Sequence, residues 1–506
     1  MFVEFMSETQ ALHGDGHPSR IDAIIRELGI PTVAYWTHAF RELPRDRVGV
    51  VKVSGKLLEP GPLVQLADEM AYLARAGIFL PLVFGGGKQY NDIPGYKDAR
   101  KVNGFRVTSA DLMKQILEIA RENQQRICEA LQRAGILADA IPLEALVAER
   151  HGSEMNEGGE RVDTGYVGDV ASIDTRVIRD ALSHGAIPVV AHVGFDGKDY
   201  LNINASPVAT ELVRSLRALK LLVLGDGAVK DQQKNIISVL SRREVRRLIA
   251  EGVITEGMIT NCNTALDLLA HLGPGHAVQI TSLKERNGNG GQNGSALAST
   301  GLLEELVGSG TGTMFVEPSN VSTYSLGQAL ERMGEEAMKN IITQAFASQR
   351  KRLLADYFDS IRTHQPTVYV DDLQAGVAIV YPFPNDPPVA YLDNVAYLCK
   401  LAVLPAYEGI GIGKTLMDHV MRQQRAKQQA LVWRTSSDNT RAIAFYDDLL
   451  ARLPSHIPCS KHPSPTTSEG HTYTVYNAGV PVGHQKIVAY RVAHLPPSLL
   501  DLRVTL

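Results

Sequence analysis

The strongest local signal in this chain is a run of alternating glycines that reads Glu408-Gly409-Ile410-Gly411-Ile412-Gly413-Lys414. An apolar stretch over 398–404 precedes it, and a segment with helical periodicity over 414–422 follows it. A strand that passes through glycines into a helix exposes backbone N–H groups at the positive end of the helix dipole. The run therefore predicts an α/β unit that binds a pyrophosphate, although glycines can also simply allow a tight turn.

The segment after the glycines supports this prediction. Residues 431–434 are a second strand candidate, and residues 439–446 read N-x-x-A-x-x-F-Y with helical spacing. Together these elements resemble the acetyl-CoA-binding core of the GNAT superfamily of N-acetyltransferases. The resemblance implies that the loop binds the coenzyme A pyrophosphate and that the preceding strand holds the pantetheine arm. The residues thus assigned to acetyl-CoA are Leu401, Ala402, Val403, Glu408, Gly409, Ile410, Gly411, Ile412, Gly413 and Lys414.

Amide formation from a thioester needs a neutral amine, donors at the developing oxyanion and an acid beside the sulfur. Backbone N–H groups of 401–403 can supply the donors, and the resemblance assigns the acid to Tyr446. The alternative for Tyr446 is an aromatic side chain that fills the core under an amphipathic helix. Glu408 departs from the Gln or Arg that usually opens this loop, so we expect its carboxylate to turn outward and Lys414 to compensate its charge.

The composition limits which classes of protein this chain can belong to. With 506 residues, the chain is expected to form two or three domains. Its net charge of −4 argues against a nucleic-acid-binding surface, and its four cysteines lack the spacing of a zinc site or a disulfide framework. The sequence also lacks a membrane-length apolar run and an N-terminal leader, so we expect a cytoplasmic protein without a metal centre.

The N-terminal half reads as an α/β domain with a parallel central sheet. A strand over 48–53, a helix over 63–76 and a strand over 79–84 lead into Gly85-Gly86-Gly87. Further strand candidates follow, interleaved with five clusters in a set order. These clusters read K-V-N-G-F-R-V-T from 101, G-Y-V-G-D-V from 165, L-N-I-N-A from 201, E-G-M from 256 and G-T-G-T from 310. Their order over 46–316 resembles N-acetylglutamate kinase of the amino-acid kinase family.

This resemblance implies a site that phosphorylates a carboxylate. Lys52 and the glycines would hold phosphate oxygens, while Arg106 and Asn202 would hold the amino acid. The predicted kinase-like site consists of Lys52, Gly55, Gly86, Gly87, Arg106 and Asn202. Taken one by one, such glycines more often form strand-end turns, and such an arginine more often forms a surface ion pair.

Two departures concern the kinase mechanism. Ser206 stands where the family has an aspartate, and Asn261 replaces the second phosphate-holding lysine. Loss of one such donor costs about a hundredfold or more in rate. We therefore expect a catalytically inactive domain that serves as scaffold or effector site, and ATP and Mg binding stays open. In the alternative, Lys56 or Lys88 replaces the missing lysine.

A kinase-like domain followed by a GNAT domain resembles the N-acetylglutamate synthases of the vertebrate type and the bacterial synthase-kinases. The expected domains are an N-terminal tail with helices over 1–45, the kinase-like domain over 46–316, a linker over 317–335 and the GNAT domain over 336–506. The resemblance implies acetylation of glutamate in arginine synthesis by a homo-oligomer, either dimer or tetramer. The alternatives are an enzyme that also phosphorylates N-acetylglutamate, an acetyltransferase for another amine, and a sensor without catalysis.

The expected acceptor site also rests on resemblance. Residues 397–403 are similar to the family's Y-L-D-K-F-A-V, with Lys400 retained and Cys399 in place of the aspartate. The predicted acceptor ligands are Lys400, Arg434, Asn439 and Arg441; the alternatives are a solvated lysine, surface arginines and a helix N-cap. In the register of the family's W-R motif, Phe445 rather than Tyr446 falls on the tyrosine. The general base stays open between Asp393, Asp438 and a water chain.

A regulatory site is also implied by resemblance. Arginine-sensitive members of the kinase family bind arginine near an E-x(5)-G-x-G-T segment. This chain matches that segment at Glu304, Gly310, Gly312 and Thr313. Arginine is therefore a hypothetical effector.

Overall fold

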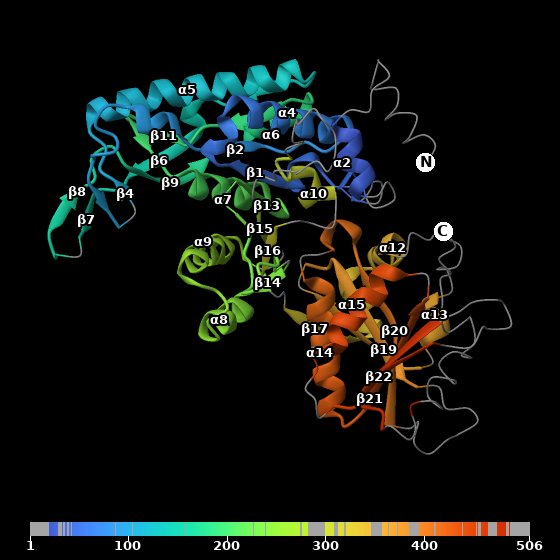
Figure 1. Cartoon of the computed structure of the whole chain (residues 1–506). Coiled ribbons are helices and arrows are strands. Elements are labelled where there is room, and N and C mark those ends of the chain that lie inside the picture. The colour runs from blue at the N-terminus through green and yellow to red at the C-terminus, as the bar shows by residue number, and fades with distance from the viewer. Residues whose placement is uncertain are drawn as a thin grey trace, which may run out of the picture. The chain divides into compact units, whose positions relative to one another are not determined.

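The structure is a computed structural model of the whole chain. It describes residues 20–28, 33, 36–37, 40–41, 43–86, 88–103, 105–156, 158–225, 227–237, 239–273, 276–281, 299–307, 312–317, 320–345, 357–362, 364–371, 373–383, 394–408, 411–437, 439–451, 453, 457–463, 473–481 and 485. The chain divides into two compact units, Met1–Glu317 and Pro318–Leu506. They are called the N-terminal and C-terminal units below (Figure 1).

An eight-stranded sheet forms the centre of the N-terminal unit, in the order β14-β16-β15-β13-β1-β2-β10-β5. Its strands are β1 (Gly49–Val53), β2 (Leu82–Phe84), β5 (Ala138–Ala140), β10 (Ile187–Val190), β13 (Lys220–Leu224), β14 (Val239–Ser241), β15 (Ala277–Thr281) and β16 (Thr313–Val316). All neighbours run parallel except β15 and β16. The inner strands β1, β2 and β13 are almost continuously apolar because both faces of a parallel sheet are covered.

Helices cover both faces of this sheet. Figure 1 shows α4 (Pro60–Arg75) and α5 (Ala110–Arg133) above the strands and α7 (Ala205–Leu216) below them. Ser109 caps the long helix α5, because its hydroxyl accepts a hydrogen bond from Leu112 N at 3.2 Å. The other helices are α2 (Arg20–Leu28), α6 (Thr175–Ser183), α8 (Arg242–Ala250), α9 (Glu256–Leu272) and α10 (Leu302–Val307).

A second sheet and two hairpins complete the N-terminal unit. The sheet has the order β12-β11-β6-β9, from β6 (Leu146–Arg150), β9 (Gly168–Ile173), β11 (Val193–Phe195) and β12 (Tyr200–Asn202). One hairpin pairs β3 (Lys101–Val102) with β4 (Phe105–Arg106), and the other pairs β7 (Ser153–Met155) with β8 (Arg161–Asp163). The predicted parallel α/β architecture is confirmed.

The C-terminal unit is built on a seven-stranded sheet in the order β17-β18-β19-β20-β21-β23-β22. Its strands are β17 (Val321–Ser325), β18 (Thr367–Asp371), β19 (Gly376–Pro382), β20 (Val395–Val403), β21 (Ala430–Ser436), β22 (Cys459–Pro463) and β23 (Tyr473–Ala478). Among these seven described strands, only β20 and β21 run parallel to each other. The helices are α11 (Leu326–Met333), α12 (Glu335–Ala345), α13 (Tyr357–Arg362), α14 (Ile412–Ala426) and α15 (Thr440–Ala451).

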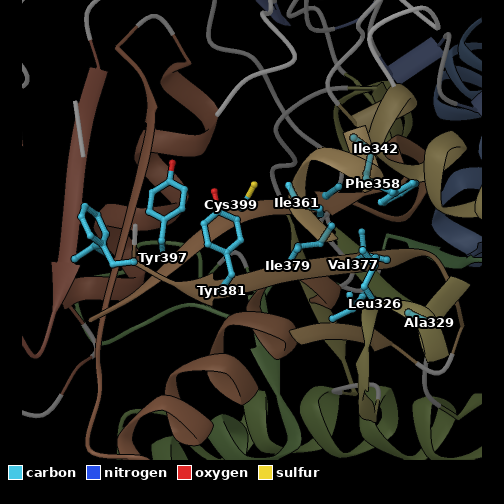
Figure 2. Close-up of a cluster of buried hydrophobic side chains, with 14 of the residues drawn as sticks. Leu326, Ala329, Ile342, Phe358, Ile361, Val377, Ile379, Tyr381, Tyr397 and Cys399 are labelled. Atoms are coloured by element: carbon cyan, nitrogen blue, oxygen red, sulfur yellow. The ribbon is translucent and has the colours of Figure 1, made fainter. Parts of the chain in front are cut away.

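The two faces of this second sheet pack against different helices. Val377 and Ile379 belong to a buried cluster that includes side chains of α11, α12 and α13 (Figure 2). Gly376 is the neighbour of Val377 in β19 and faces α14, since a Cβ placed there would lie 2.7 Å from Ile412 Cγ2. Because successive strand residues point to opposite faces, α14 lies on the face opposite to α11–α13.

The domain limits drawn from the sequence stay predictions, but one expected linker has regular structure. Within 317–335, residues 321–333 form β17 and α11. The reason is local: Ser325 and Gln328 form a capping box that starts α11 directly after the strand. Among the described residues, no helix has the length and apolarity needed to cross a membrane.

Candidate functional site

Strands β20 and β21 separate partway along their length. Their parallel ladder begins at the pair Val395–Ala430 and ends at the pair Tyr397–Val432. Beyond that point, β20 stays paired with β19 as far as Val403, and β21 stays paired with β23 as far as Ser436. From residue 398 to 403, the backbone of β20 is therefore no longer paired with β21.

A β-bulge lies in β20 just past this point of separation. Ile379 pairs with Lys400 and Val380 pairs with Leu398, so Cys399 is the extra residue. A bulge re-aims the side chains around it and bends its strand. Here it turns the chain where the two parallel strands part, and the sequence alone gave no signal for it.

The glycine loop connects β20 to α14. Gly411 is the N-cap of α14 with a φ of 93°, a left-handed conformation that favours glycine. At Gly413, a Cβ would lie 3.7 Å from Val403 and 3.8 Å from the Phe445 ring, so three elements meet there. Ile412 is 2% exposed, and its side chain packs against Gly376 of β19. Gly409 and Ile410 lie outside the described residues.

The carboxylate that opens the loop forms an ion pair. Glu408 Oε2 lies 2.7 Å from an Nη of Arg441, in the first turn of α15. Arg441, predicted as an acceptor ligand, is thus bound to the loop. Asn439, another predicted ligand, caps α15, because its Oδ1 accepts a hydrogen bond from Ala442 N at 3.0 Å. For Asn439 the structure therefore matches the alternative of a helix N-cap.

The other two predicted acceptor ligands share one face of the sheet. Lys400 is 4% exposed and pairs with Ile379, whereas Arg434 pairs with Val475. Both partners belong to the buried cluster under α11–α13, and directly paired residues project to the same face. The Arg434 guanidinium also stacks on Tyr473, 3.9 Å from the ring centroid.

A buried tyrosine, Tyr381, lies near Arg434, and sequence reasoning missed it. Figure 2 shows Tyr381, Tyr397 and Cys399 side by side. Burial most of all, and then Cys399 and Tyr397, raises the pKa of Tyr381 far above its usual range, although nearby Arg434 lowers it. Tyr381 therefore stays a neutral hydroxyl that hydrogen-bonds the Cys399 side chain. Its strand is apolar throughout, so no pattern singled it out.

Tyr446 lies on the opposite face from this cluster. Tyr446 is 8% exposed, and its ring packs 5.5 Å from Trp433 and 5.3 Å from Tyr476, measured between ring centroids. Burial raises the pKa of Tyr446 above its usual value, so its hydroxyl stays protonated. Phe445, not Tyr446, lies beside Gly413. The assignment of the acid to Tyr446 stays a prediction, and these contacts are those of a core aromatic residue.

Two polar side chains of the predicted kinase-like site, Arg106 and Asn202, form hydrogen bonds within the chain. Arg106 donates hydrogen bonds to the carbonyls of Tyr96, Lys97 and Ala99, and it stacks over the Tyr96 ring at 4.2 Å. Asn202 donates to Thr108 Oγ1 at 3.3 Å. These bonds differ from the predicted role of Arg106 and Asn202, which was to hold an amino acid.

The part of this site that was predicted to bind phosphate is closely packed at Gly86. A Cβ on Gly86 would lie 2.1 Å from the Tyr90 ring, whose hydroxyl bonds His192 Nε2 at 2.9 Å. Lys52 lies on β1, and Gly55 begins the short helix after it, whereas Gly87 lies outside the described residues. Within the part of the chain that the structure describes, no group of three His, Cys, Asp or Glu side chains is arranged to hold a metal.

Comparison with known proteins finds a matching family model in each of the two units. Residues 47–282 match the model of the amino acid kinase family, and residues 325–449 match that of the N-acetyltransferase domain of N-acetylglutamate synthase. The chain is 32% identical over 234 residues to an acetylglutamate kinase from Caldicellulosiruptor saccharolyticus, which covers 44% of this chain and 79% of that protein. It is 27% identical over 420 residues to one from Xylella fastidiosa, which covers 82% of this chain and 89% of that protein.

A solved structure has a similar fold. N-acetylglutamate synthase from Neisseria gonorrhoeae, complexed with coenzyme A and N-acetyl-glutamate, superimposes with a TM-score of 0.52 at 19% identity, covering 89% of this chain and 99% of that one. The chain therefore belongs to the amino acid kinase family and carries a second, N-acetyltransferase domain of the kind described for N-acetylglutamate synthase, which makes it an N-acetyltransferase enzyme.

Proposed function

We propose that this protein transfers the acetyl group of acetyl-CoA to the amino group of L-glutamate, a reaction of arginine biosynthesis. The observation that carries the proposal is the separation of β20 and β21 beside the glycine loop. A thioester can lie between the parted strands while its pyrophosphate meets the N-terminus of α14. The fold shared with a synthase solved with coenzyme A and N-acetyl-glutamate supports this donor and this product.

Each group at the site then has a role in the proposal. The backbone of Leu401, Ala402 and Val403 holds the pantetheine arm and stabilises the oxyanion. Lys400 and Arg434 share a face of the sheet and hold the two carboxylates of glutamate. The amine reaches the thioester at the bulge, where Cys399 and Tyr381 line the approach.

A screen of acceptor amines tests the proposal. The purified chain is given acetyl-CoA and each of the twenty amino acids, and thiol release is followed with mass detection of the acetylated product. We expect L-glutamate to give the fastest turnover, and L-aspartate and L-glutamine to be poor, since each lacks the length or charge for two cationic ligands. A different preferred amine would change the acceptor, and the absence of thiol release with every amine would remove the activity.

Phosphorylation of N-acetylglutamate is a second candidate, because curated relatives that match most of the chain are named acetylglutamate kinase. We propose that the N-terminal unit lacks this activity. Ser206 and Asn261 replace two charged groups of the site, and Arg106 is bound to backbone carbonyls. Formation of an ATP-dependent hydroxamate would decide between the two functions.

Regulation by arginine is proposed from one buried carboxylate. Glu304 is 1% exposed; its Oε2 accepts from Ser299 at 2.9 Å, and its Oε1 has no hydrogen-bond partner in the described residues. A guanidinium suits such an oxygen. Gly312 and Thr313 have structural roles, since a Cβ at 312 would strike the Ile280 carbonyl and Thr313 bonds Val229, while Gly310 lies outside the described residues. Calorimetry with arginine, alongside turnover assays, tests this effector.

The proposal also covers the oligomeric state and the cellular location of the protein. We propose a homo-oligomer, dimer or tetramer, because β5 ends the large sheet and Leu137 beside it is 60% exposed. Light scattering with size-exclusion chromatography measures the assembly. A cytoplasmic location is supported by four cysteines that form no disulfide, three of which are buried.

A further inference from the structure

The ion pair between Glu408 and Arg441 connects two parts of the coenzyme site. Glu408 follows β20 and opens the glycine loop, and Arg441 lies in the first turn of α15. The two charged atoms are 2.7 Å apart, with side chains 27% and 53% exposed. An exposed pair of this kind contributes little to folding stability. Its position at the loop suggests a role in binding instead.

The helix geometry shows which surface Arg441 belongs to. Arg441 and Phe445 are four residues apart in α15, so they lie on the same face of that helix. Phe445 is also the residue whose ring approaches Gly413 at the start of α14. The face of α15 that carries both residues therefore lines the entrance to α14, where a row of backbone N–H groups begins.

The carboxylate of Glu408 at this entrance requires a cation to offset its charge when a phosphate binds. An unpaired carboxylate at Glu408 would repel a bound pyrophosphate. Arg441 neutralises it, and a guanidinium has five N–H donors in a planar fork that suits phosphate oxygens. A guanidinium fixed by a carboxylate also loses less rotational freedom when a phosphate binds.

We propose that Arg441 is a ligand of the coenzyme A phosphates and that Glu408 positions it. This inference rests on the proposed function, because it names which part of acetyl-CoA a residue of that site binds. It moves Arg441 from the acceptor amino acid to the coenzyme. It also gives Glu408 a role at a position where a negative charge alone would weaken binding.

Calorimetric titration of the full chain with coenzyme A, dephospho-coenzyme A and pantetheine tests the assignment. Arg441→Gln is expected to weaken coenzyme A binding about 10- to 100-fold, the range for a hydrogen bond to a charged group, and to leave pantetheine binding unchanged. The same loss with dephospho-coenzyme A places Arg441 at the pyrophosphate, and a smaller loss places it at the 3′-phosphate. Arg425→Gln, an exposed arginine in the last turn of α14, is the matched control and should change nothing.

The Glu408→Gln variant tests whether Glu408 positions Arg441 for coenzyme A or only contributes to the stability of the fold. In the wild-type background it should weaken coenzyme A binding, because Arg441 loses its anchor. In the Arg441→Gln background it should strengthen binding, because an uncompensated carboxylate is removed. Two effects of the same sign would overturn the positioning role.

Steady-state kinetics give an independent reading. We expect Arg441→Gln to raise the KM for acetyl-CoA and to leave the KM for glutamate unchanged; the reverse pattern would return Arg441 to the acceptor. If the wild-type chain binds coenzyme A and Arg441→Gln binds it equally well, only this assignment fails. If the wild-type chain binds none of the three ligands, the proposed function fails with it.

Discussion

Two adjacent aromatic residues of α15 have different surroundings, which leads to a prediction about the acid. Phe445 lies at the glycine loop, and Tyr446 is buried between Trp433 and Tyr476 on the far side. We expect Tyr446→Phe to keep more than about a tenth of kcat, whereas loss of a general acid typically costs 10²- to 10⁴-fold. Stopped-flow measurement of thiol release gives the rate, and calorimetry confirms that the variant still binds coenzyme A. A loss of a hundredfold with intact binding would restore Tyr446 as the acid.

His151 gives the N-terminal unit a pH-dependent contact. Its Nδ1 lies 2.6 Å from Asp169 and its Nε2 lies 2.7 Å from Glu154. Its ring is tilted against that of Phe105 in β4, with 4.0 Å between the ring centroids. Burial lowers the pKa of His151, but the hydrogen bonds and charges of Asp169 and Glu154 outweigh burial, so the pKa is raised. A raised pKa means that the stabilisation is fully present below about pH 6.5 and is lost as pH rises through the folded-state value.

The prediction for His151 follows from that sign. His151→Asn should lower the free energy of unfolding at pH 6 by about 1 kcal/mol or less, because the carboxylates are partly exposed. At pH 9 the variant and the wild type should be nearly equal. Calorimetric unfolding at both pH values measures the gap, with His271→Asn as control because that ring bonds a backbone carbonyl. A gap that grows with pH would contradict the prediction.

Residue types at the site were predictable, but their partners were not. The sequence indicated Lys400 and Arg434 by motif, and strand register then placed both on one face. Asn439 and Arg441 were assigned to the acceptor because amides and cations suit carboxylates, yet one caps a helix and the other pairs with Glu408. Such choices depend on which side of α15 faces the loop, and a motif spacing does not encode that.

At the scale of elements, the packing of α14 on β19 sets the position of the loop. A Cβ at Gly376 would lie 2.7 Å from Ile412 Cγ2 and 3.0 Å from Leu416 Cδ1, both in the first turns of α14. Gly376→Ala should therefore displace the start of α14, cost about 1–3 kcal/mol in stability and weaken coenzyme A binding. Urea unfolding and calorimetric titration measure the two effects. Gly327→Ala, where a Cβ meets nothing within 4 Å, is the matched control, and equal behaviour of the two variants would contradict the prediction.

The order of elements around the loop could be predicted from periodicity. The irregular features of the sheet could not. The strand, glycine loop and helix were predicted because each has its own residue pattern. The bulge at Cys399 has none, since it arises from a shift of register against β19. The segment 321–333 was assigned to a linker, but its antiparallel pairing with β18 and its capping box make it an edge strand followed by a capped helix.

For the whole molecule, two units in one chain raise the question of whether both are active. The order of clusters over 46–316 indicated the kinase fold, and the match to the amino acid kinase family over 47–282 agrees. Fold alone does not fix activity, because activity depends on a few side chains. At the two positions where the family resemblance predicts charged groups, this chain has Ser206 on α7 and Asn261 on α9.

We therefore predict that the full chain phosphorylates N-acetylglutamate at least a hundredfold more slowly than an active relative. The missing charges would have stabilised the transferring phosphoryl group, and Arg106 and Asn202 are bound within the chain. Restoring Ser206→Asp and Asn261→Lys together should not recover full activity, since Arg106 and the Tyr90 ring against Gly86 remain as they are. The hydroxamate assay measures both proteins, with the Caldicellulosiruptor saccharolyticus kinase as positive control. Turnover comparable to that control in the unmodified chain would show that another lysine, such as Lys56, replaces the lost one.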